Sequence, residues 1–272
     1  MDYATLINAV LSLGGMGLLF AILIALANKK LHVEEDPRIE IVAGLLPGAN
    51  CGACGYPGCN ACAEALVNGK AALTVCPACT PEAGDQIAAT LGLTAERVER
   101  KVAVLMCQGG EGSVTIDADY QGIPTCIAAT FISGGGRACS YGCIGLGDCV
   151  AVCPFEAIRM GEKGLPVIDR QKCTGCGRCV EACPRKILEL HPISRHVFIL
   201  CKNKDNAKNA RAVCKHACIA CKICEKAVEG QGFKVDGNLA VMDHNLYTNE
   251  PVLPTDKCPT KAIVIVGHAD ER

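Results

Sequence analysis

The strongest hydrophobic pattern of the chain is one uncharged stretch near its N-terminus. No residue from Ala4 to Ala27 carries a charge. A helix over this range, rising about 1.5 Å per residue, is longer than the roughly 30 Å hydrocarbon core of a bilayer. Asp2 precedes the stretch, and Lys29 and Lys30 follow it. The positive-inside rule therefore predicts a single-pass anchor in the cell (inner) membrane, with the globular part on the cytoplasmic side.

A cleaved signal peptide is the alternative interpretation of this stretch. Ala25, Leu26 and Ala27 resemble a cleavage site. The residues before the apolar run include no basic side chain, however, and the run is longer than the apolar part of most signal peptides. The pattern therefore favours the anchor.

The later apolar runs are short and alternate with polar, cysteine-rich segments. Residues 29–40 form a charged connector, and residues 82–100 have the spacing of a helix. Runs typical of strands stand before Cys107, before Cys201 and near the C-terminal end. Short strands and helices in this mixture indicate the α+β class.

Cysteine is the most informative part of the composition, with 22 in 272 residues. Disulfides explain such a content in small secreted proteins, whereas close Cys-x-x-Cys runs in a reduced compartment indicate zinc or iron-sulfur clusters. The net charge is −1, and the chain has no tryptophan and only 4% aromatic residues. It therefore has neither the basic field nor the stacking residues expected of a nucleic-acid-binding protein.

The run "CTGCGRCVEACP" has the spacing of bacterial ferredoxins, C-x2-C-x2-C-x3-C-P. Three of its thiolates hold one four-iron cluster, and the fourth reaches a neighbouring cluster. A zinc site would leave the fourth cysteine and the proline unexplained. By this crossing rule, one predicted cluster has the ligands Cys153, Cys173, Cys176 and Cys179.

The partner run, "CSYGCIGLGDCVAVCP", is one ligand short, because Leu146 stands at a cysteine position. Cys139 is the expected substitute. The second predicted cluster then has the ligands Cys139, Cys143, Cys149 and Cys183. A three-iron cluster without Cys139 is the alternative.

An internal repeat relates residues 139–190 to residues 214–265. In the second copy the four cysteines of one crossed cluster remain, and those of the other are replaced. We expect a single cluster there, with the ligands Cys218, Cys221, Cys224 and Cys258. The replacing residues are Val228, Tyr247, Glu250 and Leu253.

Another cysteine group lies nearer the N-terminus, in "CGACGYPGC" and "VCPAC". Its spacing suits a four-iron cluster on an irregular, glycine-rich loop, with the ligands Cys51, Cys54, Cys59 and Cys76. Cys62 is interpreted as a buried apolar residue, and Cys79 is the alternative to Cys76.

The remaining thiols are open to two interpretations. Cys107, Cys126, Cys201 and Cys214 either build a further cluster or are structural cysteines. The motifs thus predict at least three 4Fe-4S clusters, and four if every assignment holds.

The expected organisation follows from these motifs. The segments are a transmembrane anchor (1–28), the charged connector (29–40), a 4Fe-4S domain (41–100), a two-cluster ferredoxin-like module (101–200) and a second ferredoxin-like module with one cluster (201–272). No nucleotide-binding loop or catalytic triad accompanies them, so no substrate-transforming site is expected beyond electron transfer.

The order of these parts resembles the B subunits of the Rnf membrane electron-transport complexes, in their longer form. The resemblance rests on the N-terminal span, "LLPGANCGACGYPGC", and "GCIGLGDCVAVCPFEAI" leading into "CTGCGRCVEACP". It implies a component of an ion-translocating ferredoxin:NAD+ oxidoreductase, coupled to Na+ or H+. The implied partners are soluble ferredoxin and other membrane subunits, which would hold the nicotinamide and flavin sites. An iron-sulfur sensor or reductase of a regulatory protein is the alternative.

Overall fold

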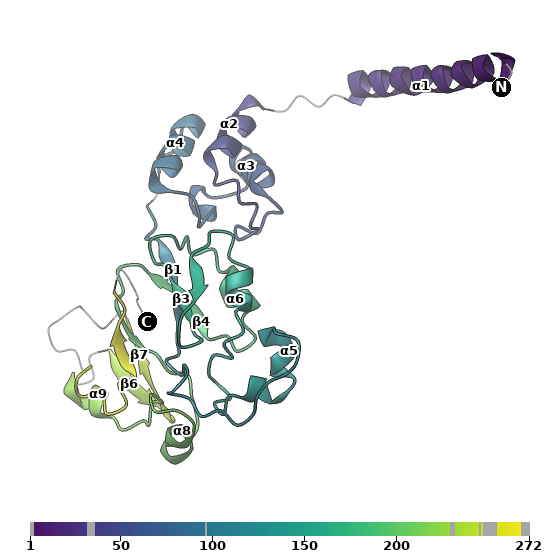
Figure 1. The fold of residues 1–272 in the computed structure, drawn as a ribbon. Coiled ribbons are helices and arrows are strands. Elements are labelled where there is room, and N and C mark those ends of the chain that lie inside the picture. Colours follow the sequence, from purple (N-terminus) through teal and green to yellow (C-terminus); the bar gives the residue numbers. More distant parts are fainter. Residues whose placement is uncertain are drawn as a thin grey trace.

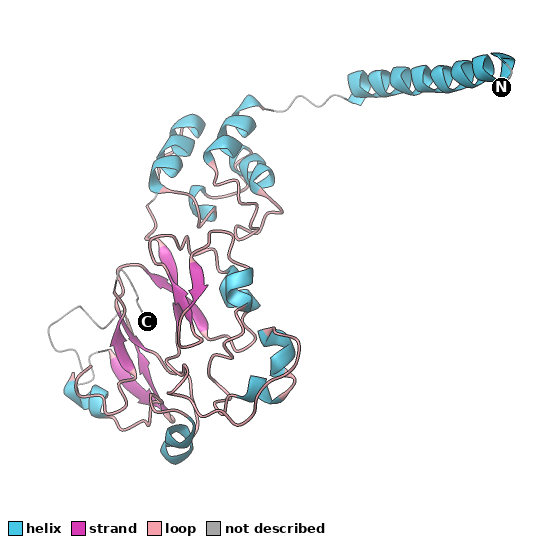
Figure 2. Ribbon diagram, in the orientation of Figure 1, coloured by secondary structure: helices cyan, strands magenta, loops and turns pink. Residues whose placement is uncertain are grey.

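The computed structural model combines a long N-terminal helix with a helical domain and two small α/β modules (Figures 1 and 2). It describes residues 3–31, 36–95, 97–228, 232–244, 246 and 255–267. Helix α1 (Tyr3–Leu31) is long and apolar enough to cross a membrane, and its described side chains are exposed. Helices and strands occur together after it, which confirms the α+β class.

The helical domain packs three helices around a small apolar core. Its elements are α2 (Pro37–Leu45), α3 (Cys59–Val67), the 3-10 turn η1 (Leu73–Val75) and α4 (Pro81–Leu91). Val42, Leu66 and Ile87 form the centre of the core. The helical pattern over 82–100 extends only to Leu91, because Gly92 takes a left-handed conformation that ends the helix.

The first α/β module is closed by pairing its two end strands. Strand β1 (Lys101–Leu105) is antiparallel to β4 (Leu188–Pro192), with Lys101 opposite Pro192. Between them lie α5 (Cys126–Thr130), η2 (Ser133–Gly136), α6 (Asp148–Ala151), the hairpin of β2 (Ile158–Met160) and β3 (Pro166–Ile168), and α7 (Arg178–Ala182).

The second module repeats this plan. Strand β5 (Val197–Ile199) is antiparallel to β8 (Ile263–Ile265), with Val197 opposite Ile265. Between them lie α8 (Ala207–Val213), α9 (Ile223–Ala227) and the hairpin of β6 (Phe233–Asp236) and β7 (Leu239–Met242). Tyr247, Glu250 and Leu253, which the repeat places at ligand positions, lie outside the described residues.

The two modules share a core and a hydrogen-bonded seam. Phe198 and Val266 of the second module are buried in the apolar cluster that contains Val102 of the first. At the seam, Thr115 donates its backbone N–H to the carbonyl of Val213 at 2.9 Å, and Val114 forms a β-bridge with Cys214. The modules are therefore packed as neighbours in one body.

Candidate iron-sulfur sites

All 22 cysteines are free thiols, and most gather in separate groups. None is joined in a disulfide, so each is available as a ligand once it is deprotonated. Among the described residues, no three Cys, His, Asp or Glu side chains converge to hold a single metal ion. A four-iron cluster attaches each thiolate to a different iron and does not need such convergence.

The helical domain brings its four expected ligands to one cavity. Its wall includes Cys51, Cys54, Cys59 and Cys76. The loop can fold around this space because Gly52 and Gly55 have φ of 73° and 84°, values that disfavour other residues. Asn50 Oδ1 accepts the backbone N–H of Cys59 at 2.8 Å and fixes the start of α3.

The two other cysteines of this domain differ in position. Cys62 is only 1% exposed, as expected for a core residue, but it also borders the cavity. Burial, followed by the neighbouring Cys54, raises the pKa of Cys62 to about 12. The Cys79 thiol donates to the carbonyl of Thr80 at 3.6 Å and is not part of the cavity wall. The geometry therefore favours Cys76 over Cys79 as the ligand.

The ferredoxin run also brings its expected ligands together. One cavity is lined by Cys153, Cys173, Cys176 and Cys179. The backbone N–H of Ala103 on β1 donates to Cys173 Sγ at 3.4 Å, which favours a thiolate. Burial raises the pKa of Cys179 to about 12, and a bound iron-sulfur cluster would favour its thiolate form.

At the next site the cavity differs from the sequence prediction for Cys139. The cavity that holds the partner run is lined by Cys126, Cys143, Cys149 and Cys183, and Cys139 does not border it. Asp148 Oδ1 and Oδ2 accept the backbone N–H groups of Cys126 and Ile127 at 2.9 and 3.1 Å. Because Asp148 precedes Cys149 on α6, this pair of bonds holds the start of α5 beside the site.

A backbone hydrogen bond of the residue before Cys139 positions this cysteine away from the cavity of Cys143 and Cys149. Ala138 donates its N–H to the carbonyl of Thr115 at 2.9 Å, in the segment that forms the seam with the second module. Cys139 therefore borders a different cavity, together with Cys107, Cys201 and Cys214. Sequence spacing could not identify Cys126, because no motif links it to Cys143.

The repeat contained a signal against Cys139. Cys139 stands four residues before Cys143, as Cys214 stands four residues before Cys218. The second copy already has four ligands without Cys214, so the equivalent residue of the first copy was a weak candidate. The free position left by Leu146 was the reason for choosing it.

The second module brings its four expected cysteines together. Cys218, Cys224 and Cys258 pack in one cluster, with Cys221 as a further neighbour, and burial raises the pKa of Cys224 to about 11. The backbone N–H of Ala240 on β7 donates to Cys218 Sγ at 3.4 Å. Val228, at the position of a missing ligand, packs against the same core.

Contacts connect these groups in one order along the molecule. Arg178 Nη1 donates to the carbonyl of Cys51 at 3.1 Å, which joins the helical domain to the ferredoxin run. Cys179 and Cys149 in turn lie in the same buried cluster of the first module. The cysteine groups of the helical domain and of the first module therefore form a continuous row.

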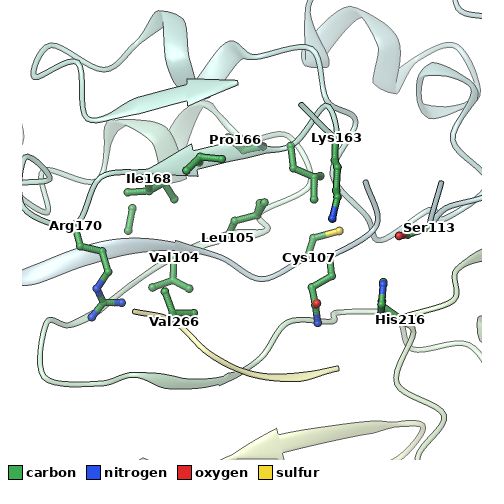
Figure 3. A pocket seen from close by; sticks show the side chains of 14 residues that line it. Val104, Leu105, Cys107, Ser113, Lys163, Pro166, Ile168, Arg170, His216 and Val266 are labelled. Atoms are coloured by element: carbon green, nitrogen blue, oxygen red, sulfur yellow. The ribbon is translucent and has the colours of Figure 1, made fainter. Parts of the chain in front are cut away.

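A larger cavity beside β1 differs from these sites (Figure 3). Val104 and Ile168 of the first module and Val266 of the second lie around it, with Cys107 as its one cysteine among the described lining residues. The side chains are mostly apolar. This cavity marks packing between the modules and gathers no ligand set.

Two family matches agree with this arrangement. The family described as "Putative Fe-S cluster" matches residues 46–78, which include the ligands expected in the helical domain. The family described as "4Fe-4S dicluster domain" matches residues 141–187, in the first module. Both matches support iron-sulfur clusters as the cofactors.

Curated relatives match nearly the whole chain. The B subunit of the ion-translocating oxidoreductase complex of Methanosarcina acetivorans is 40% identical over 96% of this chain and 98% of its own length. The B subunit of the Na(+)-translocating ferredoxin:NAD(+) oxidoreductase complex of Acetobacterium woodii is 44% identical over 95% of this chain and 78% of its own. The B subunit of the proton-translocating ferredoxin:NAD(+) oxidoreductase complex of Clostridium ljungdahlii is 37% identical, over 94% and 91%.

These similarities confirm the expected setting: an iron-sulfur electron-transfer subunit of a multi-subunit, membrane-bound oxidoreductase. The chain belongs to the family formed by the B subunits of Rnf-type ion-translocating oxidoreductase complexes.

Proposed function

We propose that this protein accepts electrons from reduced soluble ferredoxin and relays them to the membrane subunits of a ferredoxin:NAD+ oxidoreductase complex that translocates Na+ or H+. The observation that carries the proposal is the packing of successive cysteine groups: Arg178 of the ferredoxin run donates to the carbonyl of Cys51, and Cys179 and Cys149 lie in one buried cluster. When bound, a four-iron cluster accepts and releases one electron. Relatives that match nearly the whole chain carry names that include ferredoxin, NAD(+) and ion translocation.

Four ligand sets follow from the cavities and neighbours described above. They are Cys51, Cys54, Cys59 and Cys76; Cys153, Cys173, Cys176 and Cys179; Cys126, Cys143, Cys149 and Cys183; and Cys218, Cys221, Cys224 and Cys258. Backbone N–H groups point at the sulfurs of Cys173 and Cys218, and such bonds stabilise thiolates in a buried site.

The basic end of α1 supports a cytoplasmic globular part. Lys29 and Lys30 lie in the last turn of the helix, at the end that leads to the cysteine domains. Ferredoxin is a soluble protein of that compartment, so this orientation would let it dock. Protease treatment of sealed vesicles of known orientation tests the sidedness, since the globular part should be cut only from the cytoplasmic face.

The relay is tested by electron acceptance. The full chain, prepared without oxygen in detergent, is mixed with ferredoxin reduced chemically and separated from excess reductant. We expect the visible absorption of the clusters to bleach and their reduced EPR signals to appear. If no cluster is reduced at any ferredoxin potential, the proposal is wrong. Copurification of integral-membrane subunits would separate a complex component from a free regulatory reductase.

A further inference from the structure

Four cysteines that belong to none of these ligand sets line one cavity between the two modules. They are Cys107, Cys139, Cys201 and Cys214. The first two come from the first module and the last two from the second. Cys143 also borders this cavity, but it is already a member of the set with Cys149 and Cys183.

The first module supplies its pair from two segments. Cys107 follows β1, and its Sγ accepts the backbone N–H of Gly109 at 3.2 Å and that of Cys143 at 3.5 Å. Cys139 Sγ accepts a hydrogen bond from Asn203 Nδ2 at 3.6 Å. Since Asn203 belongs to the second module, this bond crosses the seam.

The second module supplies its pair in equivalent positions. Cys201 follows β5, and its Sγ accepts the backbone N–H of Asn203 at 3.5 Å and that of Cys218 at 3.3 Å. For Cys107 too, one donor lies two residues after the cysteine, and the other is Cys143, which the repeat aligns with Cys218. The repeat thus places two matching pairs of sulfurs on opposite sides of one space.

The seam brings the two pairs together. Thr115 accepts the backbone N–H of Ala138, next to Cys139, while Ser113 accepts the backbone N–H of Lys215, next to Cys214. A Cβ placed on Gly109 would lie 3.5 Å from Cys107 Sγ and 3.6 Å from Cys214 Sγ. Sulfurs from both modules therefore flank the same backbone.

We propose that Cys107, Cys139, Cys201 and Cys214 hold a fifth four-iron cluster at the seam between the modules. Four thiolates are the donor set that a cubane requires, and here both modules supply them. Arg137 borders the cavity and donates to the carbonyls of Gly109 and Cys143, so its positive charge lies beside the thiolates and offsets part of their negative charge. Cysteines that only filled space would need neither the N–H donors nor this cation.

This cluster would also complete the row of sites, a role that rests on the proposed relay function. The N–H of Cys143 touches Cys107 on one side, and the N–H of Cys218 touches Cys201 on the other. The fifth site therefore lies between the last set of the first module and the set of the second. It would connect the second module to the remainder of the protein.

The site can be tested without any assay of activity. The full protein is prepared anaerobically in detergent, and iron and acid-labile sulfide are measured per chain. Five clusters predict about twenty irons and four predict about sixteen. Cys139→Ala and Cys201→Ala should each lose about four irons and the same EPR signal, and the double variant should lose no more than either. Cys79→Ala is the matched control and should keep all iron.

A second double variant separates the structural assignment from the sequence prediction. Cys126→Ala combined with Cys139→Ala should lose about eight irons, because the two residues serve different clusters. A wild-type count near sixteen, or unchanged iron in both Cys139→Ala and Cys201→Ala, would overturn the proposal. Reduction by ferredoxin would be unaffected by that result, so the relay function and the fifth site can fail separately.

Discussion

The carboxylate of Asp148 holds the backbone amide of Cys126 at 2.9 Å, across 22 residues of sequence. The same side chain accepts the N–H of Ile127. One residue thus joins the start of α5 to α6 and places a cysteine without a motif beside Cys149.

Replacing this carboxylate should affect one cluster. Asp148→Ala removes two charge-assisted hydrogen bonds, at a cost of about 1 to 3 kcal/mol in the free energy of unfolding. With α5 released, we expect the site of Cys126 to lose iron, while Asp148→Glu keeps more of it. EPR of the reduced protein, with iron per chain, measures this. An Asp148→Ala protein with full iron and an unchanged spectrum would show that Cys126 needs no such support.

Cys258 should be essential to one cluster of the second module. Cys258→Ala removes the ligand that lies farthest in sequence from Cys218, Cys221 and Cys224, and should cost about four irons per chain. Val228→Ala is the matched control, since Val228 stands where the repeat has lost a ligand and packs against the same core. Iron per chain is measured for both variants. An equal iron content in the two would contradict the assignment of Cys258 as a ligand.

The imidazole of His244 should make stability depend on pH. Burial, followed by Arg195 and His191, lowers its pKa from 6.5 to about 4. Between these values the unfolded chain binds the proton and the folded protein does not, so folding is progressively disfavoured as the pH falls from 6.5 to 4. Above pH 6.5 the imidazole is neutral in both states, and its protonation no longer lowers the free energy of unfolding.

The variant His244→Gln isolates this contribution. The melting temperature of the wild type, compared with that of the variant, should fall as the pH is lowered through this window. A constant difference between the two proteins would show that His244 titrates equally in both states. Comparison of two proteins at each pH removes the effect of acid on the clusters, which both proteins share.

Arg178 should control how the helical domain sits against the first module. Its guanidinium donates to the carbonyl of Cys51 at 3.1 Å, from an exposed position next to Cys179. Arg178→Met should leave iron unchanged and alter the melting temperature little, because exposed hydrogen bonds contribute about 1 kcal/mol or less. It should weaken the magnetic coupling between the two neighbouring clusters. Pulsed EPR measures the coupling, with the exposed Lys172→Met as control.

Local motifs predicted the sites whose ligands are close in sequence. The run from Cys173 to Cys183 needs only its own spacing, and the crossing rule adds Cys153. Cys258 was found at long range because the repeat supplied a template. The cavities hold these residues as the motifs imply.

Tertiary contacts decided what the motifs could not. The sequence favoured Cys139 as the substitute for Leu146, whereas the backbone bonds of Asp148 and Thr115 place Cys126 at the cavity and Cys139 away from it. The shared cavity of Cys107 and Cys214 likewise depends on how the modules pack. Nothing in the sequence spacing specifies that packing.

The pairing of end strands also affects how the chain folds. Lys101 lies opposite Pro192, and Val197 opposite Ile265, so each module is completed only when the two ends of a long segment meet. Closing such loops is slow, because the entropy is lost before the contacts form. The hairpins β2–β3 and β6–β7 close over a few residues and should form first. Until the end strands meet, the cysteines that the closed modules bury, such as Cys107 and Cys214, are exposed to solvent and to oxidants.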